Sequence, residues 1–162
     1  MGLDRHSVST RLGWRMIIAN EKFADCSTEC AIFVAMHWEE LFGKKKFRAN
    51  WKAVEALEKS GQFAYYTMRD DLGKLCGHLG YRISECPFFG CLTATDSFFY
   101  VLPEHRGTHE ISNLLRFAAK HLQSCGIEDV FAAHLVVNNK LPAAMDRSGY
   151  SLVSKMYRYE GE

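Results

Sequence analysis

The residues best suited to chemistry lie in one continuous stretch, residues 97–126, where an apolar segment leads through a basic turn into a helical pattern. Residues 97–102 are rich in aromatic and β-branched side chains, which are typical of a strand, and a proline ends that strand. Arg106 and Gly107 then form the turn, and Thr108 is a residue type that commonly caps a helix. A strand that leads directly into a helix N-terminus offers unpaired backbone N–H groups to an anion. The stretch therefore predicts an anion-binding site at the turn.

The helix expected over residues 109–125 has its apolar side chains three or four positions apart, as on one face of an amphipathic helix. These side chains are Ile111, Leu114, Leu115, Ala118, Leu122 and Cys125. Gly126 follows where a glycine usually ends a helix. We expect the leucine face to pack across the strand 97–102 and Lys120 and Gln123 to be exposed.

The order V-x-P-x-x-R-G followed by a helix resembles motif A of the GNAT (Gcn5-related) N-acyltransferases. The residues that carry the match are Val101, Pro103, Arg106, Gly107, Leu114 and Leu115. The match continues at Asn138 and at Gly149-Tyr150, where the family has an asparagine and a glycine followed by an aromatic residue. It is specific over residues 92–159. Because the turn is poor in glycine, the chain further resembles degenerate GNAT-like proteins encoded by phages.

The resemblance implies acetyl-CoA as co-substrate and no metal. In the family, the strand pairs with the pantetheine arm, and the turn and helix N-terminus hold the pyrophosphate. Carried over to this sequence, the implied cofactor-binding residues are Tyr100, Val101, Arg106, Gly107, Thr108, His109, Glu110, Ile111 and Asn138. The implied second partner is an amine acceptor, either a small molecule or a protein. The family builds its acceptor groove from the first helices, their connecting loop and the last hairpin, which makes His37, Trp38, Glu39 and Tyr157 candidate lining residues.

The sequence departs from the family pattern at the turn and in the following short helix. His109 and Ile111 stand where the motif has glycines, and a Cβ atom restricts how closely the backbone can approach a phosphate. Glu110 would add a negative charge beside a dianionic ligand. Met145 stands where the family often has a tyrosine that protonates the leaving thiolate, and methionine has no proton to give.

Acyl transfer to an amine needs a base for the amine, an acid for the leaving thiolate and a donor for the oxyanion. A backbone N–H of the strand that ends near Val101 is the expected oxyanion donor. The candidate bases are Asp96 on the central strand and His134 on the next strand; the structural alternatives are a solvent-facing aspartate and a hydrogen-bonded histidine. Tyr150 is the candidate acid in place of Met145, with Ser148 or a water molecule as alternatives.

Composition limits the classes of protein to consider. The chain has 162 residues, of which 48% are apolar and 24% charged, values typical of one globular domain. Its net charge of +1 gives no electrostatic reason to expect nucleic acid as a partner. No apolar run approaches the roughly 20 residues of a membrane span, so we expect no membrane partner. The expected location is the cytoplasm, or the host cytoplasm or virion if the source is a phage.

The six cysteines include no C-x-x-C pair. One interpretation is a zinc site formed by Cys26, Cys30 and a histidine such as His37. The other is a set of reduced thiols in the core, which the apolar surroundings of most of them favour.

The remaining elements complete the predicted fold. Residues 1–12 are expected to form a flexible arm, and residues 13–162 a single GNAT-like domain, monomeric or homodimeric. The predicted strands cover residues 14–19, 63–69, 74–83, 97–102, 128–137 and 150–159, and the predicted helices residues 25–42, 50–59, 109–125 and 138–147. Asp25 or Ser27 is the expected cap of the first helix, and Gly77 and Gly80 predict a bulge or a close backbone approach.

This order predicts an α/β protein with the GNAT fold, a mixed, mostly antiparallel, twisted sheet of about six to seven strands with helices on both faces. A Rossmann-like domain and a ferredoxin-like sheet are the alternatives, but the glycine fingerprint of the first is absent. Three functions stay open: an N-acyltransferase, which is favoured, an inactive binding or structural protein, and a CoA-binding regulator.

Overall fold

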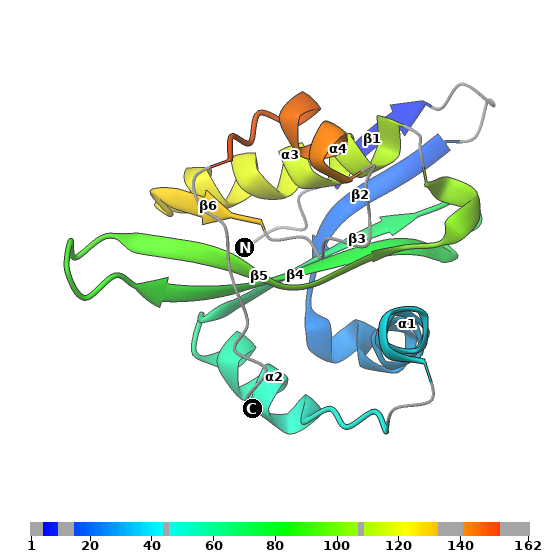
Figure 1. Ribbon diagram of the computed structural model, residues 1–162, viewed down its shortest axis with the longest axis horizontal. Coiled ribbons are helices and arrows are strands. Elements are labelled where there is room, and N and C mark those ends of the chain that lie inside the picture. Colours follow the sequence, from blue (N-terminus) through cyan, green and yellow to red (C-terminus); the bar gives the residue numbers. More distant parts are fainter. Residues whose placement is uncertain (1–4, 10–14, 44–45, 107–108, 133–140, 153–162) are drawn as a thin grey trace, which may run out of the picture.

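The structure is a computed structural model that describes residues 5–9, 15–43, 46–106, 109–132 and 141–152. Within these residues, six strands form one sheet in the order β1-β2-β3-β4-β5-β6 (Figure 1). The strands are β1 (Arg5–Ser9), β2 (Arg15–Glu21), β3 (Phe63–Arg69), β4 (Leu75–Glu85), β5 (Leu92–Val101) and β6 (Asp129–Phe131). All neighbouring pairs are antiparallel except β5 and β6, which are parallel. This is the mixed, mostly antiparallel sheet that the sequence predicts.

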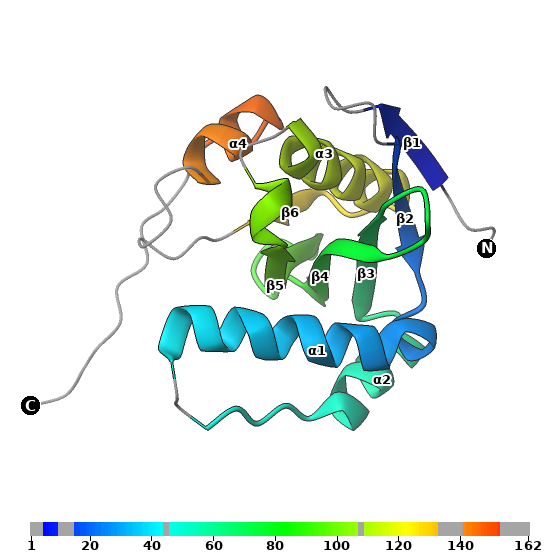
Figure 2. The same ribbon diagram turned by 90° about the vertical axis from the view of Figure 1, so that its right-hand side faces the viewer.

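Helices cover both faces of the sheet (Figure 2). The long helix α1 (Phe23–Phe42) and the shorter α2 (Trp51–Lys59) lie on one face. The opposite face carries α3 (His109–Ser124) and α4 (Leu141–Arg147). No helix in the described part of the chain has both the length and the apolar character required to cross a membrane.

The main core lies between α3 and the sheet. Leu114, Leu115, Ala118 and Leu122 of α3 are buried there, and Lys120 and Gln123 are exposed, which confirms the face that the periodicity predicts. They pack against buried side chains of four strands, namely Met16, Ile18, Tyr66, Met68, Cys76, Leu79, Tyr81, Ala94 and Val101. Cys125, which was expected on the same face, is exposed and follows the last residue of α3, so the predicted face is one residue too long.

A second core lies beneath α1, whose N-terminus is stabilised from outside the helix. Phe23 is buried against Phe63 and Tyr65, with both ring pairs edge-on at 5.9 and 5.6 Å. The helix begins at Phe23, so the expected capping by Asp25 or Ser27 is wrong. Instead, the Glu58 carboxylate of α2 accepts hydrogen bonds from the backbone N–H groups of Phe23 and Ala24. A tertiary contact thus satisfies the first N–H groups of α1.

The hairpin between β3 and β4 has the turn that its sequence predicts. Asp70 Oδ1 accepts hydrogen bonds from the N–H groups of Leu72 and Lys74 at 3.0 and 2.8 Å, and Gly73 has a φ of 82°. The predicted irregularity at Gly80 is also present, because the β4–β5 register shifts between Gly80 and Tyr81. A Cβ atom at Gly80 would lie 2.6 Å from the ring of Phe98, so only glycine fits without rearrangement.

Two parts of the sheet differ from the sequence-based prediction. Residues 5–9, which were expected within a flexible arm, form β1 and pair with residues 15–19 of β2. β5 starts at Leu92, five residues before the predicted strand, because its first half pairs with β6 as well as β4. The predicted strand 150–159 lies largely outside the described residues, and residues 150–152 are not part of a strand.

Candidate functional site

Among the described residues, β5 and β6 pair over three residues, and the rest of β5 has no described neighbour on that side. Residues 93–95 of β5 pair with residues 129–131 of β6. On the other side of β5, Phe98 pairs with Gly80 and Asp96 with Tyr81, so Ser97 between them is a bulge residue. From residue 96 onward, β5 has a neighbour on one side only among the described strands. Its backbone edge there presents the N–H and C=O groups that an extended ligand can pair with.

The N-terminus of α3 lies just beyond this edge. The helix begins at His109, and the N–H groups of its first turn have no acceptor within the helix. Such N–H groups and the helix dipole favour an anion, and the anion site expected at this N-terminus stays a prediction. The side chain of His109 is exposed and that of Ile111 is half-buried. That their Cβ atoms restrict the approach of a phosphate stays a prediction.

The Glu110 side chain does not lie where the sequence analysis places its charge. The residue is only 5% exposed, and its Oε2 atom is buried without a hydrogen-bond partner in the described part of the chain. The expected repulsion between the Glu110 carboxylate and a bound anion stays a prediction, because burial alone does not remove the charge of a carboxylate. Protein encloses the carboxylate, and the backbone N–H of Glu110 is the group that remains for an anion.

Arg106 is held by three contacts, all with residues of α1 or β5. Its Nη1 and Nη2 atoms donate to the two carboxylate oxygens of Glu40 at 2.6 and 2.7 Å, and its Nε donates to the Val101 carbonyl at 2.7 Å. The guanidinium also lies over the Tyr100 ring, 5.0 Å from its centroid. The hydrogen bonds from Arg106 lower the pKa of Glu40, so the pair is charged at neutral pH. Arg106 is thus engaged within the protein, and sequence reasoning missed Glu40, which is 66 residues away.

Tyr100 contributes backbone, not side chain, to the exposed edge of β5. The residue is 5% exposed, and its ring packs edge-on against Phe33 at 5.8 Å and tilted against His37 at 5.3 Å. All three rings lie between α1 and the sheet. Burial lowers the pKa of His37, which favours a neutral imidazole. His37, a candidate lining residue of the acceptor groove, therefore lies directly beside the strand that carries the turn.

The structure brings two of the candidate catalytic residues together on the α3 face. Asp96 is the register partner of Tyr81, and the Tyr81 hydroxyl lies 2.9 Å from that of Tyr150. Burial raises the pKa of Tyr150, and the nearby charge of Asp96 raises it further. Met145 is buried in the same cluster, and its carbonyl accepts a hydrogen bond from the Tyr150 N–H. Sequence reasoning missed Tyr81, because nothing in its local pattern separates it from a core tyrosine.

Five predicted site residues lie outside the described residues. These are Gly107, Thr108, His134, Asn138 and Tyr157. Their roles in binding the cofactor, accepting a proton or lining the acceptor groove stay predictions.

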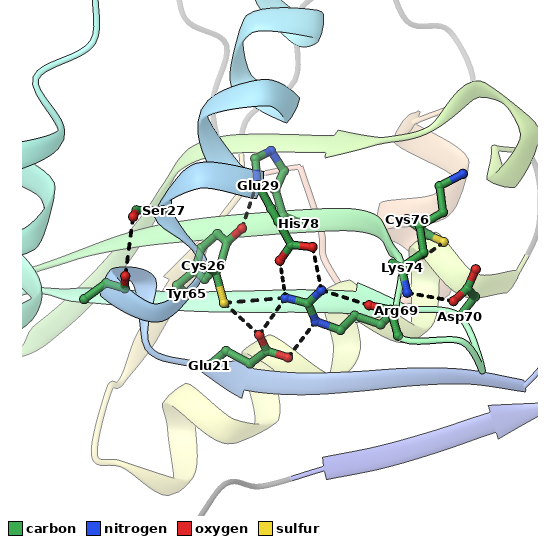
Figure 3. A network of polar contacts seen from close by, with 12 residues as sticks. Glu21, Cys26, Ser27, Glu29, Tyr65, Arg69, Asp70, Lys74, Cys76 and His78 are labelled. Atoms are coloured by element: carbon green, nitrogen blue, oxygen red, sulfur yellow. Dashed lines mark hydrogen bonds and ion pairs between the residues drawn. The ribbon is translucent and has the colours of Figure 1, made fainter.

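A second polar cluster, centred on Arg69, joins α1 to the C-terminal end of β3 (Figure 3). The guanidinium of Arg69 bonds to both carboxylate oxygens of Glu21 and of Glu29, at 2.7–3.1 Å. Arg69 and Glu21 are largely buried, with side-chain exposures of 17% and 19%. Burial alone would raise the pKa of Glu21, but the hydrogen bonds from Arg69 and Cys26 outweigh it and the pKa is lowered. The cluster is an internal ion-pair network that fixes α1 on the sheet.

The two thiols considered for zinc are buried beside this network. Burial raises the pKa of Cys26 and of Cys30 to about 12, which disfavours the thiolates that zinc requires. Among the described residues, no group of three or more histidine, cysteine and acidic side chains is placed to hold a metal ion.

One mixed sheet between two layers of helices, with the N-terminus of α3 following β5, defines the class of this fold as α/β. Residues 26–150 match the model of the Acetyltransferase (GNAT) family, so the chain belongs to that family. A comparison with curated protein sequences gives no match.

Solved structures of acetyltransferases have the same fold. One is an aminoglycoside acetyltransferase from an uncultured soil metagenomic sample, in complex with sisomicin, with a TM-score of 0.72, 14% identity and coverage of 91% of this chain and 95% of that one. Another is a ribosomal-protein-alanine N-acetyltransferase from Brucella melitensis, with a TM-score of 0.68, 18% identity and coverage of 90% and 99%. A third is glucosamine-6-phosphate N-acetyltransferase from Arabidopsis thaliana, with a TM-score of 0.67, 15% identity and coverage of 90% and 99%.

Proposed function

We propose that the protein is an N-acetyltransferase that transfers the acetyl group of acetyl-CoA to a primary amine of a small molecule or protein. The observation that carries this proposal is the juxtaposition of three features: the edge of β5 from residue 96, which has no partner among the described strands, the N-terminus of α3 at His109, and the Asp96–Tyr81–Tyr150 cluster. Family membership supports it. The structurally similar acetyltransferases are named for an aminoglycoside, for ribosomal-protein alanine and for glucosamine-6-phosphate, all of which carry amines.

The described residues fit acetyl-CoA as a co-substrate. Residues 96–101 would hold its extended arm through their backbone groups, and the N–H groups of residues 109–111 would hold its pyrophosphate. Glu110 is buried beside this N-terminus, and the charge that its carboxylate would carry still opposes such binding. Gly107, Thr108 and Asn138 complete the proposed cofactor site on the strength of the family resemblance. Acetyl-CoA supplies an activated thioester, which an amine can attack.

In the proposed reaction, Asp96 accepts the proton that the attacking amine loses, and His134 is the alternative base. A backbone N–H of β5 donates to the oxyanion that develops on the acyl carbonyl. As the C–N bond forms and the C–S bond breaks, Tyr150 donates its proton to the leaving thiolate. Asp96 then loses its proton to solvent and Tyr150 regains one, so the site returns to its starting state.

The test measures binding and turnover separately. Acetyl-CoA should raise the melting temperature of the purified protein, because a ligand that binds only the folded state stabilises it. Release of free CoA should then depend on an added amine and fall in Asp96→Asn and Tyr150→Phe. The matched control is Asp129→Asn, which changes an exposed carboxylate on β6 of the same sheet. Folded protein that shows no thermal shift at millimolar acetyl-CoA would contradict the proposal.

A second candidate function is a GNAT-like protein without turnover, such as a CoA-binding regulator or a phage virion or host-interaction protein. Two observations favour it: Met145 is buried where the family often has its tyrosine acid, and Arg106 is paired with Glu40. This alternative predicts that no amine in a broad panel releases CoA.

A further inference from the structure

The hydroxyl groups of Tyr81 and Tyr150 form a pair close to the last described residue pair between β5 and β6. Tyr81 pairs with Asp96 next to the register shift between β4 and β5. Thr95, which precedes Asp96 in β5, makes the last described pair with β6. Tyr150 follows α4 in sequence, and a turn at Gly149, with a φ of 90°, brings it back over the sheet. The two hydroxyl oxygens lie 2.9 Å apart although the residues are 69 positions apart in sequence.

The burial of the two rings decides which hydroxyl donates. Tyr81 is fully buried at 0% exposure, and Tyr150 is the hydrogen-bond partner of its hydroxyl within the described structure. A buried O–H that makes no hydrogen bond is strongly disfavoured, so the Tyr81 proton belongs to this contact. The Tyr150 oxygen therefore accepts this hydrogen bond, and the Tyr150 hydroxyl can donate its own proton to a group outside the pair. Tyr150 is half-buried, so such a group can reach it.

We infer that Tyr81 is a positioning residue whose hydroxyl donates to Tyr150 and so makes Tyr150 the proton donor to the leaving thiolate, a role that rests on the proposed acetyl transfer. When Tyr150 releases its proton, a tyrosinate oxygen forms, and the donated hydrogen bond from Tyr81 stabilises that charge. Solvent then returns the proton to Tyr150, and Tyr81 keeps its own proton throughout. The pair supplies the acid function that Met145 lacks.

Groups on several elements act on Tyr150, and their signs set the expected pH dependence. Burial and the charge of Asp96 on β5 raise the pKa of Tyr150, whereas the hydrogen bond from Tyr81 on β4 lowers it. On β3, the nearby Tyr66 hydroxyl pairs with Nδ1 of His121 on α3 at 2.9 Å, not with Tyr150. Loss of the Tyr81 hydroxyl should therefore move the pKa of Tyr150 upward. The alkaline limb of the rate profile should move in the same direction, since the acid is active while protonated.

The experiment compares Tyr81→Phe with Tyr66→Phe. Both residues are fully buried tyrosines with one described hydroxyl contact, and their rings are 6.2 Å apart, so Tyr66→Phe controls for loss of a core hydroxyl. Two quantities are measured: steady-state kinetics of acetyl transfer, and the alkaline titration of Tyr150 by NMR of isotope-labelled tyrosine rings, assigned with Tyr150→Phe. The titration needs no substrate and therefore does not depend on turnover.

For Tyr81→Phe we expect kcat to fall about tenfold, the size typical for one hydrogen bond to a charged group, with the KM for acetyl-CoA nearly unchanged. The pKa of Tyr150 should rise, and Tyr66→Phe should change neither quantity. An unchanged pKa of Tyr150 in Tyr81→Phe, or an equal change in Tyr66→Phe, would overturn the inference. Wild-type protein that binds acetyl-CoA but transfers no acetyl group contradicts the proposed function instead, and the titration then still decides whether Tyr81 donates to Tyr150.

Discussion

The Glu40 carboxylate neutralises the positive charge that Arg106 would otherwise present beside the N-terminus of α3. Both guanidinium ends of Arg106 are bonded to Glu40, and its Nε is bonded to the last carbonyl of β5. Arg106 therefore fixes the strand end and α1 relative to the turn. Any contribution of Arg106 to anion binding has to compete with this internal partner.

Replacing Glu40 by glutamine should strengthen the binding of acetyl-CoA. The substitution removes one negative charge near the anion site and releases the Arg106 cation, and we expect the Kd to fall about three- to tenfold at low salt. Isothermal titration calorimetry measures the change, with Glu39→Gln, an exposed neighbour on the same helix, as the control. Weaker binding in Glu40→Gln would show that acetyl-CoA binding depends on the Arg106–Glu40 ion pair and not on a free Arg106 charge.

Met145 limits the chemistry that the short helix α4 can provide. Met145→Tyr should raise kcat toward a small amine by roughly 10–100-fold, because it adds a proton donor at the position where the family often has one. The affinity for acetyl-CoA should change little. Met145→Phe, which adds a ring of similar size without the hydroxyl, controls for the repacking of this 8%-exposed site. An equal gain in Met145→Phe would mean that ring packing, not the hydroxyl, raises the rate.

Helix α1 depends on α2 for its N-terminal cap. Lys22 at the N-cap position makes no side-chain hydrogen bond to the helix, and the Glu58 carboxylate takes this role from another element. The long helix and the short one are thereby joined at one end. At the same time, the Arg69 network joins α1 to β2 and β3.

Glu58→Ala should lower the free energy of unfolding by about 0.5–2 kcal/mol, the usual cost of losing a helix cap. Glu58→Gln keeps one side-chain oxygen that can accept a hydrogen bond and should lose less. Urea denaturation followed by circular dichroism measures both, and Glu55→Ala on the same helix serves as the control. If Glu58→Ala is as stable as the wild type, the cap contributes nothing to stability.

Across the whole molecule, stability should depend on pH through His78, the fully buried histidine between α1 and the sheet. Its Nδ1 lies 3.2 Å from the Tyr65 hydroxyl, and its Nε2 is buried without a hydrogen-bond partner in the described structure. Burial, with a smaller contribution from His37, lowers the pKa of His78 from 6.5 to about 3. The folded protein therefore keeps His78 neutral where the unfolded chain already binds a proton.

The folded state should consequently lose stability as the pH falls below 6.5, because protons bind preferentially to the unfolded chain. One such group contributes a slope of up to about 1.4 kcal/mol per pH unit. The pKa of Glu21 is lowered from 4.5, so its protonation destabilises the fold only at lower pH. Between about pH 5 and 6.5, the pH dependence of stability therefore reports on histidines. Urea unfolding at a series of pH values should give a smaller slope in His78→Gln than in the wild type. Equal slopes in the two proteins would contradict the assignment to His78.

Features with short-range causes were predictable from the sequence. Asp70 and Gly73 lie within the hairpin turn that they form, and Asn50 caps α2 through a hydrogen bond to Ala53 N at 3.2 Å, three residues away. The leucine face of α3 was predictable because helix geometry fixes the spacing of side chains on one face. The strand, turn and helix around Arg106 were predictable for the same reason.

The sequence by itself determined the order of helices and strands and the strand–turn–helix stretch around Arg106, because these depend on residues close together in the chain, and its resemblance to the GNAT family predicted the mixed sheet. Only the tertiary structure decided the partners of the functional side chains. It paired Arg106 with Glu40, Tyr81 with Tyr150 and the N-terminus of α1 with Glu58, across 66, 69 and 35 residues. It also buried Glu110, which local rules place at a solvent-facing helix start. Local spacing cannot fix such contacts, since they follow from how the helices pack on the sheet.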